Sequence, residues 1–341
     1  MAGFRRTGAS LLAALALAGC ETLSYYAQAV GGQMSLIALA RPVEKLIADP
    51  VTPPELRARL ALARSIRDFA AQELSLPDNA SYRSYAELDR PYAVWNVVAA
   101  PEFSLEPVQS CFPVAGCVDY RGFFSRDDAV RHAARLLAEG YDVHMVGVPA
   151  YSTLWRFDDP LLSTFIGYGD AELARLIFHE LAHQRVYVRD DSTFNESFAA
   201  TVEREGVRRW LAASGRAALL RGFLEAQRRT AEFAALLGQA RARLEALYRL
   251  RIAPEAMRER KRAELDALRA KLPKSGADGD SPRLEPNNAL LASFATYTQL
   301  VPAFEKLLAE ENGDLARFYA RVERYAASER SSRGPLSAPR P

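Results

Sequence analysis

The sequence predicts an α+β fold that is mostly helical, with a small mixed sheet and a long C-terminal helical hairpin. Two observations predict it. Short runs rich in aromatic and β-branched residues, broken by Pro and Gly, are concentrated between about residues 81 and 153. Elsewhere apolar residues recur at helical spacing, most densely in the Ala-, Leu-, Arg- and Glu-rich stretch 216–272. The 341 residues are 49% hydrophobic and 25% charged, which is typical of a globular protein.

The first element is a leader. "MAGFRRTGASLLAALALAGC" has Arg5 and Arg6, followed by an apolar stretch that is too short to span a bilayer. Its end, Leu17-Ala18-Gly19-Cys20, resembles the lipobox of bacterial lipoproteins. The resemblance implies a signal peptide over 1–19 and a lipid anchor on Cys20 in the bacterial envelope. Glu21 then favours the outer membrane, facing the periplasm. An ordinary signal peptide with a chance cysteine is the alternative.

The segment 20–80 is expected to be helical, in two stretches. The first is "YYAQAVGGQMSLIALARPVEKLIADP", and the second begins at Pro53 and Pro54 and carries apolar residues at helical spacing. A catalytic core is predicted over 81–212. It starts with strands in "PYAVWNVVAA" and "CVDYRGFF", followed by a helix capped by Ser125 and a strand in "YDVHMVGVPAYST".

Two further features limit the function. Cys111 and Cys117 lie in "CFPVAGC", and an exported chain meets an oxidising compartment, so a short disulfide loop is favoured over a thiol or metal site. A chain beginning at Cys20 would carry 42 basic and 42 acidic residues, because Arg5 and Arg6 account for the net charge of +2. The charge of the chain therefore gives no indication that it binds nucleic acid.

The chemistry is expected in "IFHELAHQRVYVRDDSTFNESFA". Residues i and i+4 share a helix face, so His179 and His183 can direct ring nitrogens at one ion. Glu180 then lies beside the metal, where it can serve as general base towards the attacking water. This is the H-E-x-x-H pattern of zinc peptidases. Asp170 is expected to cap the helix.

A third ligand is expected from Glu196, near the start of a returning helix. Ala199 and Ala200 share its face and are small enough for the two helices to pack closely. Glu203 lies on the same face, so it is a candidate for binding a substrate amine or supporting a ligand. A plain solvent-exposed glutamate is the alternative for Glu203.

Other site candidates concern the substrate. A peptidase needs an edge strand that holds the substrate backbone, and the strand with Gly147 and Pro149 precedes the metal helix. A donor to the developing oxyanion is also needed. The candidates are Tyr151, Tyr168, Tyr187 and Tyr297. Tyr297 is preferred because it shares a predicted helix with Asn288, a further substrate-binding candidate. Core packing is the alternative role for each tyrosine.

The remaining chain, 213–327, is expected to form the C-terminal hairpin and closing helices, interrupted by a flexible loop in "KSGADGDSPRLEP". Charges on the hairpin are interpreted as solvated faces. The tail 328–341 is expected to be disordered.

Several stretches together resemble the bacterial putative aminopeptidase family of exported zincin-like lipoproteins. They are "YRGFF", the run from "GYDVHMVGVPAYST" to "FAATVEREG", and "NNALLASFATY". The resemblance implies a zincin-like fold and a gluzincin-type site. In that site His179, His183 and Glu196 hold one Zn²⁺, and Glu180 is the base.

The sequence therefore favours a zinc metallopeptidase, most simply an aminopeptidase, that acts on peptides or proteins from a lipid anchor. Zinc is inferred from the ligand types. The alternative is a non-catalytic, zinc-stabilised envelope lipoprotein that acts as an interaction module. A structural site has no use for a general base, so Glu180 argues for catalysis.

Overall fold

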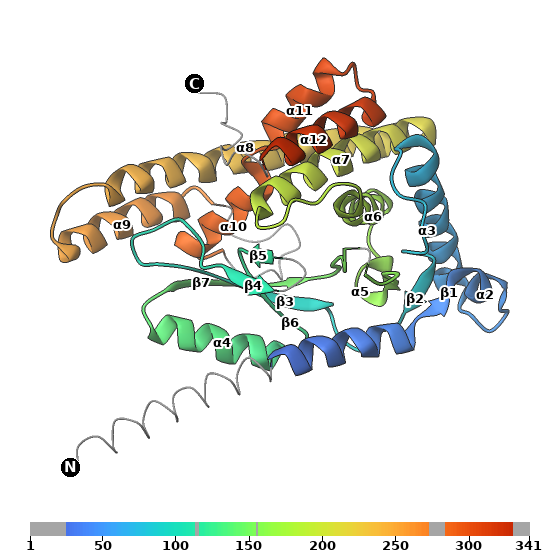
Figure 1. Cartoon of the computed structure of the whole chain (residues 1–341), viewed down its shortest axis with the longest axis horizontal. Coiled ribbons are helices and arrows are strands. Elements are labelled where there is room, and N and C mark those ends of the chain that lie inside the picture. The colour runs from blue at the N-terminus through green and yellow to red at the C-terminus, as the bar shows by residue number, and fades with distance from the viewer. Residues whose placement is uncertain (1–24, 113–115, 155, 273–283, 330–341) are drawn as a thin grey trace, which may run out of the picture.

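The computed structural model describes residues 25–112, 116–154, 156–272 and 284–329. It is mostly helical (62%) with small sheets, which confirms the α+β class (Figure 1). Cys20, the expected signal peptide 1–19 and residues 330–341 of the expected tail lie outside the described residues. None of the described helices is long and apolar enough to cross a membrane.

The N-terminal part is helical, but its first expected stretch is interrupted. One helix covers residues 25–39, strand β1 (Arg41–Pro42) follows, and α2 (Val43–Ala48) begins directly after it. Pro42 lacks the N–H that a continuous helix needs and biases the preceding residue to extended backbone, which explains the break. Helix α3 (Pro54–Glu73) starts at its proline and buries one apolar face.

The strands form three small sheets among the described residues, where one was expected. Strand β3 (Val94–Ala100) lies antiparallel between β6 (Arg121–Phe123) and β7 (Asp142–Val148). Strand β2 (Ser84–Ala86) pairs antiparallel with β1 and parallel with β8 (Leu161–Leu162). Strand β4 (Ser110–Phe112) pairs with β5 (Gly116–Val118), and a disulfide joins Cys111 to Cys117 across them.

Helices cover both faces of the β6-β3-β7 sheet (Figure 1). Helix α4 (Arg126–Ala138), with Ser125 as its N-cap, packs on one face around Val97 and Phe123. Helix α10 (Asn288–Thr298) packs on the other, where Ala289 meets Val98 and Ala100. Strand β7 has a strand neighbour on one side only among the described residues, so it is an edge strand.

The main core surrounds α6 (Asp170–Arg185) and α7 (Ser192–Ala213). It includes apolar residues of α3 and of the short α5 (Ser163–Ile166), and of α11 (Val301–Glu310) and α12 (Leu315–Glu329) near the C-terminus. Gly206 of α7 permits this packing, because a Cβ there would lie 2.8 Å from side-chain carbons of Leu74 and Phe178. Both ends of the described chain therefore stabilise the same helix pair.

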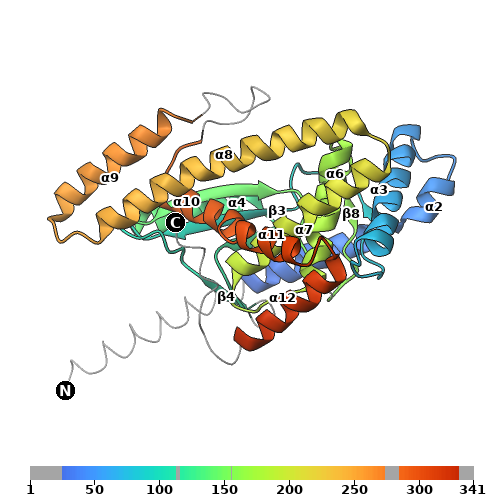
Figure 2. The same ribbon diagram turned by 90° about the horizontal axis from the view of Figure 1, so that it is seen from above.

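A second, smaller core lies in the C-terminal hairpin. Helices α8 (Ala217–Tyr248) and α9 (Pro254–Arg269) pack through Leu244, Leu265 and Leu268. Both figures show them projecting side by side beyond the sheet (Figure 2). The remaining stretch, expected to be helical, divides into α10, α11 and α12. The division into a core of 81–212 and flanking segments stays a prediction.

Candidate metal centre

Helix α6 carries the two histidines through the middle of the core. The helix is apolar on nearly all sides, with Leu173, Ile177, Phe178 and Leu181 fully buried. The expected cap at Asp170 is wrong: Gly169 is the N-cap and Asp170 is the first helical residue. Its carboxylate instead accepts hydrogen bonds from Arg59 at 2.6 Å and Arg216 at 2.7 Å. An acidic residue in the first turn still stabilises the helix dipole.

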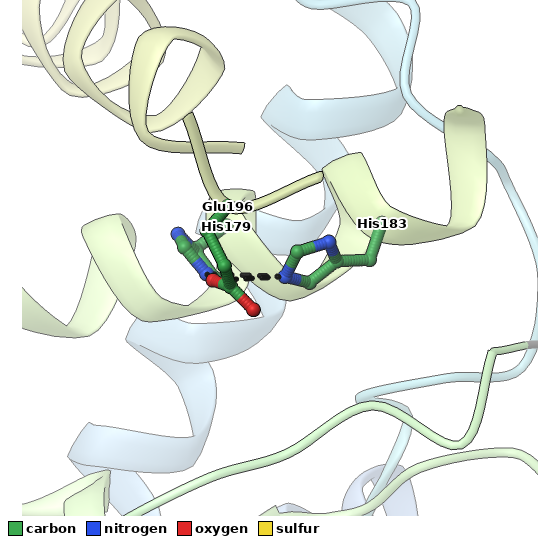
Figure 3. Close-up of side chains that lie close together, drawn as sticks. All are labelled: His179, His183 and Glu196. Carbon is green, nitrogen blue, oxygen red and sulfur yellow. Dashed lines mark hydrogen bonds and ion pairs between the residues drawn. The ribbon is translucent and has the colours of Figure 1, made fainter. Parts of the chain in front are cut away.

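Three side chains from α6 and α7 meet in one buried cluster (Figure 3). His179 Nε2 lies 3.2 Å from Glu196 Oε2 and 3.2 Å from His183 Nε2, and His183 Nε2 lies 3.6 Å from Glu196 Oε2. Tetrahedral zinc with bonds of about 2.0–2.2 Å places neighbouring ligand atoms about 3.3–3.6 Å apart. The residues therefore fit a divalent cation, and their donor types are compatible with zinc.

The electrostatics of the cluster also suit a cation. Burial raises the pKa of a carboxyl group, but His183 and His179 outweigh that effect and hold the pKa of Glu196 at about 2. Burial likewise lowers the pKa of His179, yet hydrogen bonds and charges from Glu196 and Glu203 raise it to about 10. The carboxylates thus favour positive charge between the two helices, and a divalent cation would supply it.

Asn195 shapes the connection that brings Glu196 to the histidines. Its Oδ1 accepts a hydrogen bond from the backbone N–H of Val188 at 2.7 Å, and its Nδ2 donates to the carbonyl of Val188 at 2.7 Å. Asp191 accepts from the N–H of Phe194 and caps α7. These contacts close the loop between α6 and α7, so that Glu196 enters in the first turns of the returning helix.

Glu203 lies between His179 and Arg175. Its Oε2 lies 2.9 Å from His179 Nδ1 and 3.2 Å from the guanidinium of Arg175, and its side chain is buried. A carboxylate on the outer ring nitrogen fixes the tautomer and orientation of a metal-binding histidine. The contacts favour Glu203 as a residue that positions His179, its burial excludes a plain solvent-exposed glutamate, and binding of a substrate amine stays a prediction.

Glu180 is not part of the cluster formed by His179, His183 and Glu196. It is 7% exposed, and its carboxylate has no hydrogen-bond partner among the described residues. Burial raises the pKa of Glu180, His179 and His183 lower it, and the charges of Glu196 and Glu203 raise it further. The net pKa lies above the usual value of a glutamate, which suits a group that accepts and returns a proton.

Among the tyrosines, Tyr297 lies beside the cluster. Its ring centre is 6.5 Å from that of His179, with the rings nearly parallel, and the residue is 36% exposed. The negative charge of Glu196, followed by burial, raises its pKa well above the usual value, so its hydroxyl keeps its proton. Burial and Glu196 also raise the pKa of Tyr187 to about 12.

The other tyrosine candidates are engaged elsewhere. The hydroxyl of Tyr151 donates to Gln33 Oε1, and its ring contacts Phe124. The carbonyl of Tyr168 accepts from Arg59, and burial raises its hydroxyl pKa without a contribution from the three-residue cluster. Tyr151 thus links the first helix to Phe124, and its assignment to the substrate site stays a prediction.

Asn288 and Gly147 have structural roles. Asn288 is fully buried: its Oδ1 accepts from Tyr248, and its Nδ2 donates to the carbonyls of Pro101 and Glu102 at 3.0 Å. These contacts hold Asn288 in the packing between α8, α10 and the loop after β3, and its assignment to substrate binding stays a prediction. Gly147 lies on the edge strand β7 opposite Trp95, and a Cβ there would come within 2.3 Å of the Tyr92 ring.

Several residues of the site were missed from the sequence. Arg175 lies one helical turn before His179, and Asn195 directly precedes Glu196. Their spacing from these residues could have identified both as neighbours of the site. Tyr82 and Asp159 come from segments distant in sequence, so no spacing relates them to the site. The Tyr82 hydroxyl is buried without a hydrogen-bond partner, and burial and the charges of Glu180 and Asp159 raise its pKa.

Comparison with known proteins identifies a family. Residues 24–335 match the model of a family described as "Putative aminopeptidase". No match was found among curated proteins or among solved structures. The matched range spans the His179–His183–Glu196 cluster and all of the described residues.

Proposed function

Because the chain belongs to the family described as "Putative aminopeptidase", we propose that it is a zinc-dependent peptidase with a zincin-like catalytic core. The family supports a peptidase at a coarse level. One observation carries the finer statement: two histidines and a glutamate converge on one point with spacings that suit tetrahedral zinc, while a second glutamate, Glu180, stays free beside them.

His179, His183 and Glu196 would hold the zinc, and Glu203 would orient His179 through its Nδ1–H. When bound, zinc supplies a Lewis acid that polarises a carbonyl and lowers the pKa of water. Arg175 neutralises Glu203 by an ion pair at 3.2 Å. This ion pair reduces the electrostatic repulsion between Glu203 and the carboxylates of Glu196 and Glu180.

The Glu180 carboxylate takes the proton of the attacking water and then returns it to the leaving amine. Its raised pKa makes both transfers accessible near neutral pH, since a stronger acid would not hold the proton between the two steps. The Tyr297 hydroxyl, which remains protonated beside Glu196, donates to the oxyanion that develops on the attacked carbonyl.

An extended peptide would add to the free edge of β7, which carries Gly147. With Glu203 committed to His179, no described residue is assigned to a substrate amine. We retain aminopeptidase action as the preferred mode because of the family, and endopeptidase action as its alternative. We further propose that a lipid on Cys20 anchors the chain to the outer membrane, facing the periplasm.

The test is metal content and hydrolysis by a chain of residues 21–341, which keeps every described residue, compared with Glu180→Gln. We expect about one zinc per chain in both proteins and hydrolysis of a peptide library by the wild type alone. Free amino-terminal and blocked peptides in the library separate the two modes of cleavage.

Zinc in both proteins without hydrolysis by either would reject the catalytic proposal in favour of a zinc-stabilised interaction module. Absence of zinc from both would reject the metal centre itself. A Glu205→Gln variant serves as the control for Glu180→Gln, because Glu205 lies on α7 in ion pairs with Arg208 and Arg209, away from the ligands.

A further inference from the structure

The helix over residues 25–39 has an exposed face without any charged residue. Tyr26 is 36% exposed, Val30 61% and Met34 53%. The three recur at i, i+4 and i+8 and so lie on one face. The remaining exposed residues of the helix are also uncharged: Ala27, Gly31, Ser35, Ala38 and Leu39. We call this set the apolar face. Surface helices of soluble proteins usually carry charge on their outer side.

The opposite side of this helix is fixed to the protein. Leu36 is 2% exposed within the main core. Gln28 accepts a hydrogen bond from the backbone N–H of Phe124 at 3.0 Å, and Gln33 accepts from Tyr151. Gly32 lies against the Phe124 ring, where a Cβ would come within 2.2 Å. The helix therefore cannot roll to bury its apolar face against the rest of the chain.

The position of the apolar face close to Cys20 in the sequence indicates which environment the face contacts. Tyr25 begins the described helix only five residues after Cys20. Five residues of extended chain span at most about 18 Å. If Cys20 carries a lipid, the start of this helix is held within that distance of the bilayer surface. The face that lacks charge is thus brought to the one environment that favours uncharged, apolar side chains.

We propose that the apolar face lies in the interfacial layer of the lipid bilayer and acts as a second membrane contact beside the lipid on Cys20. This inference rests on the lipid anchor of the proposed function. A second copy of the chain is a poorer occupant, since three half-exposed side chains offer far less than the roughly 800 Å² per partner of a standard interface.

The contact would fix how the protein sits on the membrane. The helix runs along the lower edge of the molecule in Figure 1, whereas α8, α11 and α12 lie along the opposite edge, with α6 between. A lipid on a short chain leaves the protein free to tilt. A helix laid flat on the surface would hold α6 and the edge strand β7 at a constant height above it.

The experiment uses the chain from Cys20 onward, coupled through Cys20 to a maleimide with one acyl chain. Cys111 and Cys117 are joined to each other, so Cys20 is the reactive thiol. One acyl chain binds vesicles only marginally, which leaves room to measure a second contribution. Partitioning onto uncharged phosphatidylcholine vesicles is compared for the wild type and Val30→Asp/Met34→Asp.

The matched control is Leu219→Asp/Leu224→Asp on α8, where the two side chains are 46% and 48% exposed. It adds the same charge far from the apolar face. We expect the partition coefficient to fall about tenfold or more for the Val30/Met34 variant, because partly burying two such side chains is worth more than a kcal/mol. The control should stay within twofold of the wild type. Circular dichroism verifies that both variants are folded.

Equal partitioning of all three proteins would overturn the proposal. So would an equal loss in both variants, which would indicate only a charge effect. A wild-type chain that dimerises without vesicles, and a variant that does not, would assign the face to a second copy. Because the lipid is attached chemically, these outcomes do not depend on lipidation in the cell, which mass spectrometry of Cys20 tests separately.

Discussion

At the scale of single residues, Glu203 fixes the orientation of His179, one of the three proposed zinc ligands. It joins Nδ1 of His179 to the guanidinium of Arg175 inside the core. The arrangement leaves Nε2 of His179 directed at Glu196 and His183. A carboxylate in this place makes the ring a better donor to a cation and prevents it from rotating.

We therefore predict that Glu203→Gln lowers zinc affinity about 10- to 100-fold, because the amide keeps the shape of the carboxylate and loses its charge. Competition with a chromophoric zinc chelator measures the change. Glu205→Gln is the matched control on the same helix, and its affinity should equal that of the wild type. Equal affinities in all three proteins would show that Glu203 is only a packing residue.

Asp159 gives a prediction about pH. It is 4% exposed, and burial raises its pKa to about 6, although hydrogen bonds from Thr153 lower it and the charge of Glu180 adds to the increase. In the unfolded chain its pKa is about 4. Between these values the folded protein holds a proton that the unfolded chain releases, so stability falls as pH rises through this window.

Two pKa units correspond to about 3 kcal/mol of unfolding free energy. We expect urea unfolding to show part of this loss in the wild type between pH 4 and 7, and a shallower fall in Asp159→Asn. The comparison concerns the slope with pH, so any constant effect of the amide on stability cancels. Parallel slopes would mean that Asp159 titrates in the folded protein as it does in the unfolded chain.

Single residues also show which parts of the site could be predicted from the sequence and which could not. His179 and His183 follow from helical spacing and Glu196 from the short connection to a returning helix, and the structure places the three together. Asn288 looked like a site residue because it shares a helix with Tyr297. Its amide bonds instead to a loop 186 and 187 residues away in sequence, and no local pattern reports such a contact.

At the scale of elements, the site depends on how closely α6 and α7 approach. Ala199 and Ala200 are buried on the α7 side, and Gly206 lies against Phe178 of α6 and Leu74 at the end of α3. Small residues at these positions let the two helix axes come near enough for side chains from both to share one ion. Overpacking between them would separate the ligands.

Gly206→Ala should destabilise the protein by about 1–3 kcal/mol, because the new methyl group meets two side chains at 2.8 Å. Gly238→Ala in α8 is the matched control. A Cβ at Gly238 meets nothing within 4 Å, so that variant should gain up to about 1 kcal/mol from helix propensity. Chemical denaturation measures both, and a stable Gly206→Ala protein would show that the helix pair can move apart without cost.

The elements themselves were predicted unevenly. The metal helix, the strands at β3 and β7 and the α8–α9 pair have long, consistent patterns and lie where expected. The continuous helix expected after residue 25 breaks at Arg41–Pro42, and the single sheet divides into three. Strands of two or three residues such as β1, β2 and β8 form because strands distant in sequence pair with them. Their own residues show no pattern long enough to predict a strand.

At the scale of the whole molecule, the His179–His183–Glu196 cluster sits inside a large apolar core. Phe178 and Phe198 are fully buried on the metal helices, and Phe304 and Phe318 close the core from α11 and α12. A protein with this much apolar packing around the ligands should remain folded when the ligands are empty, unlike a small zinc domain that folds only with its metal.

Chelation should consequently abolish hydrolysis while the helical circular dichroism signal is kept. We expect the melting temperature to fall by several degrees, because a bound ion stabilises the folded state by mass action. Calorimetry with and without chelator, followed by added zinc, measures the shift and its reversal. Loss of all helical signal on chelation would show instead that the metal is required for folding.

The helical hairpin α6–α7 also has a consequence for the order of folding. The ligands are separated by only 4 and 17 residues, and Glu203 by 24 from His179, whereas the contact between Tyr319 and the end of α3 closes a loop of 245 residues. Short loops cost less entropy to close and form sooner. One contiguous stretch thus carries all three ligand candidates and Glu203, and it can assemble before the C-terminal helices that later cover it have packed in place.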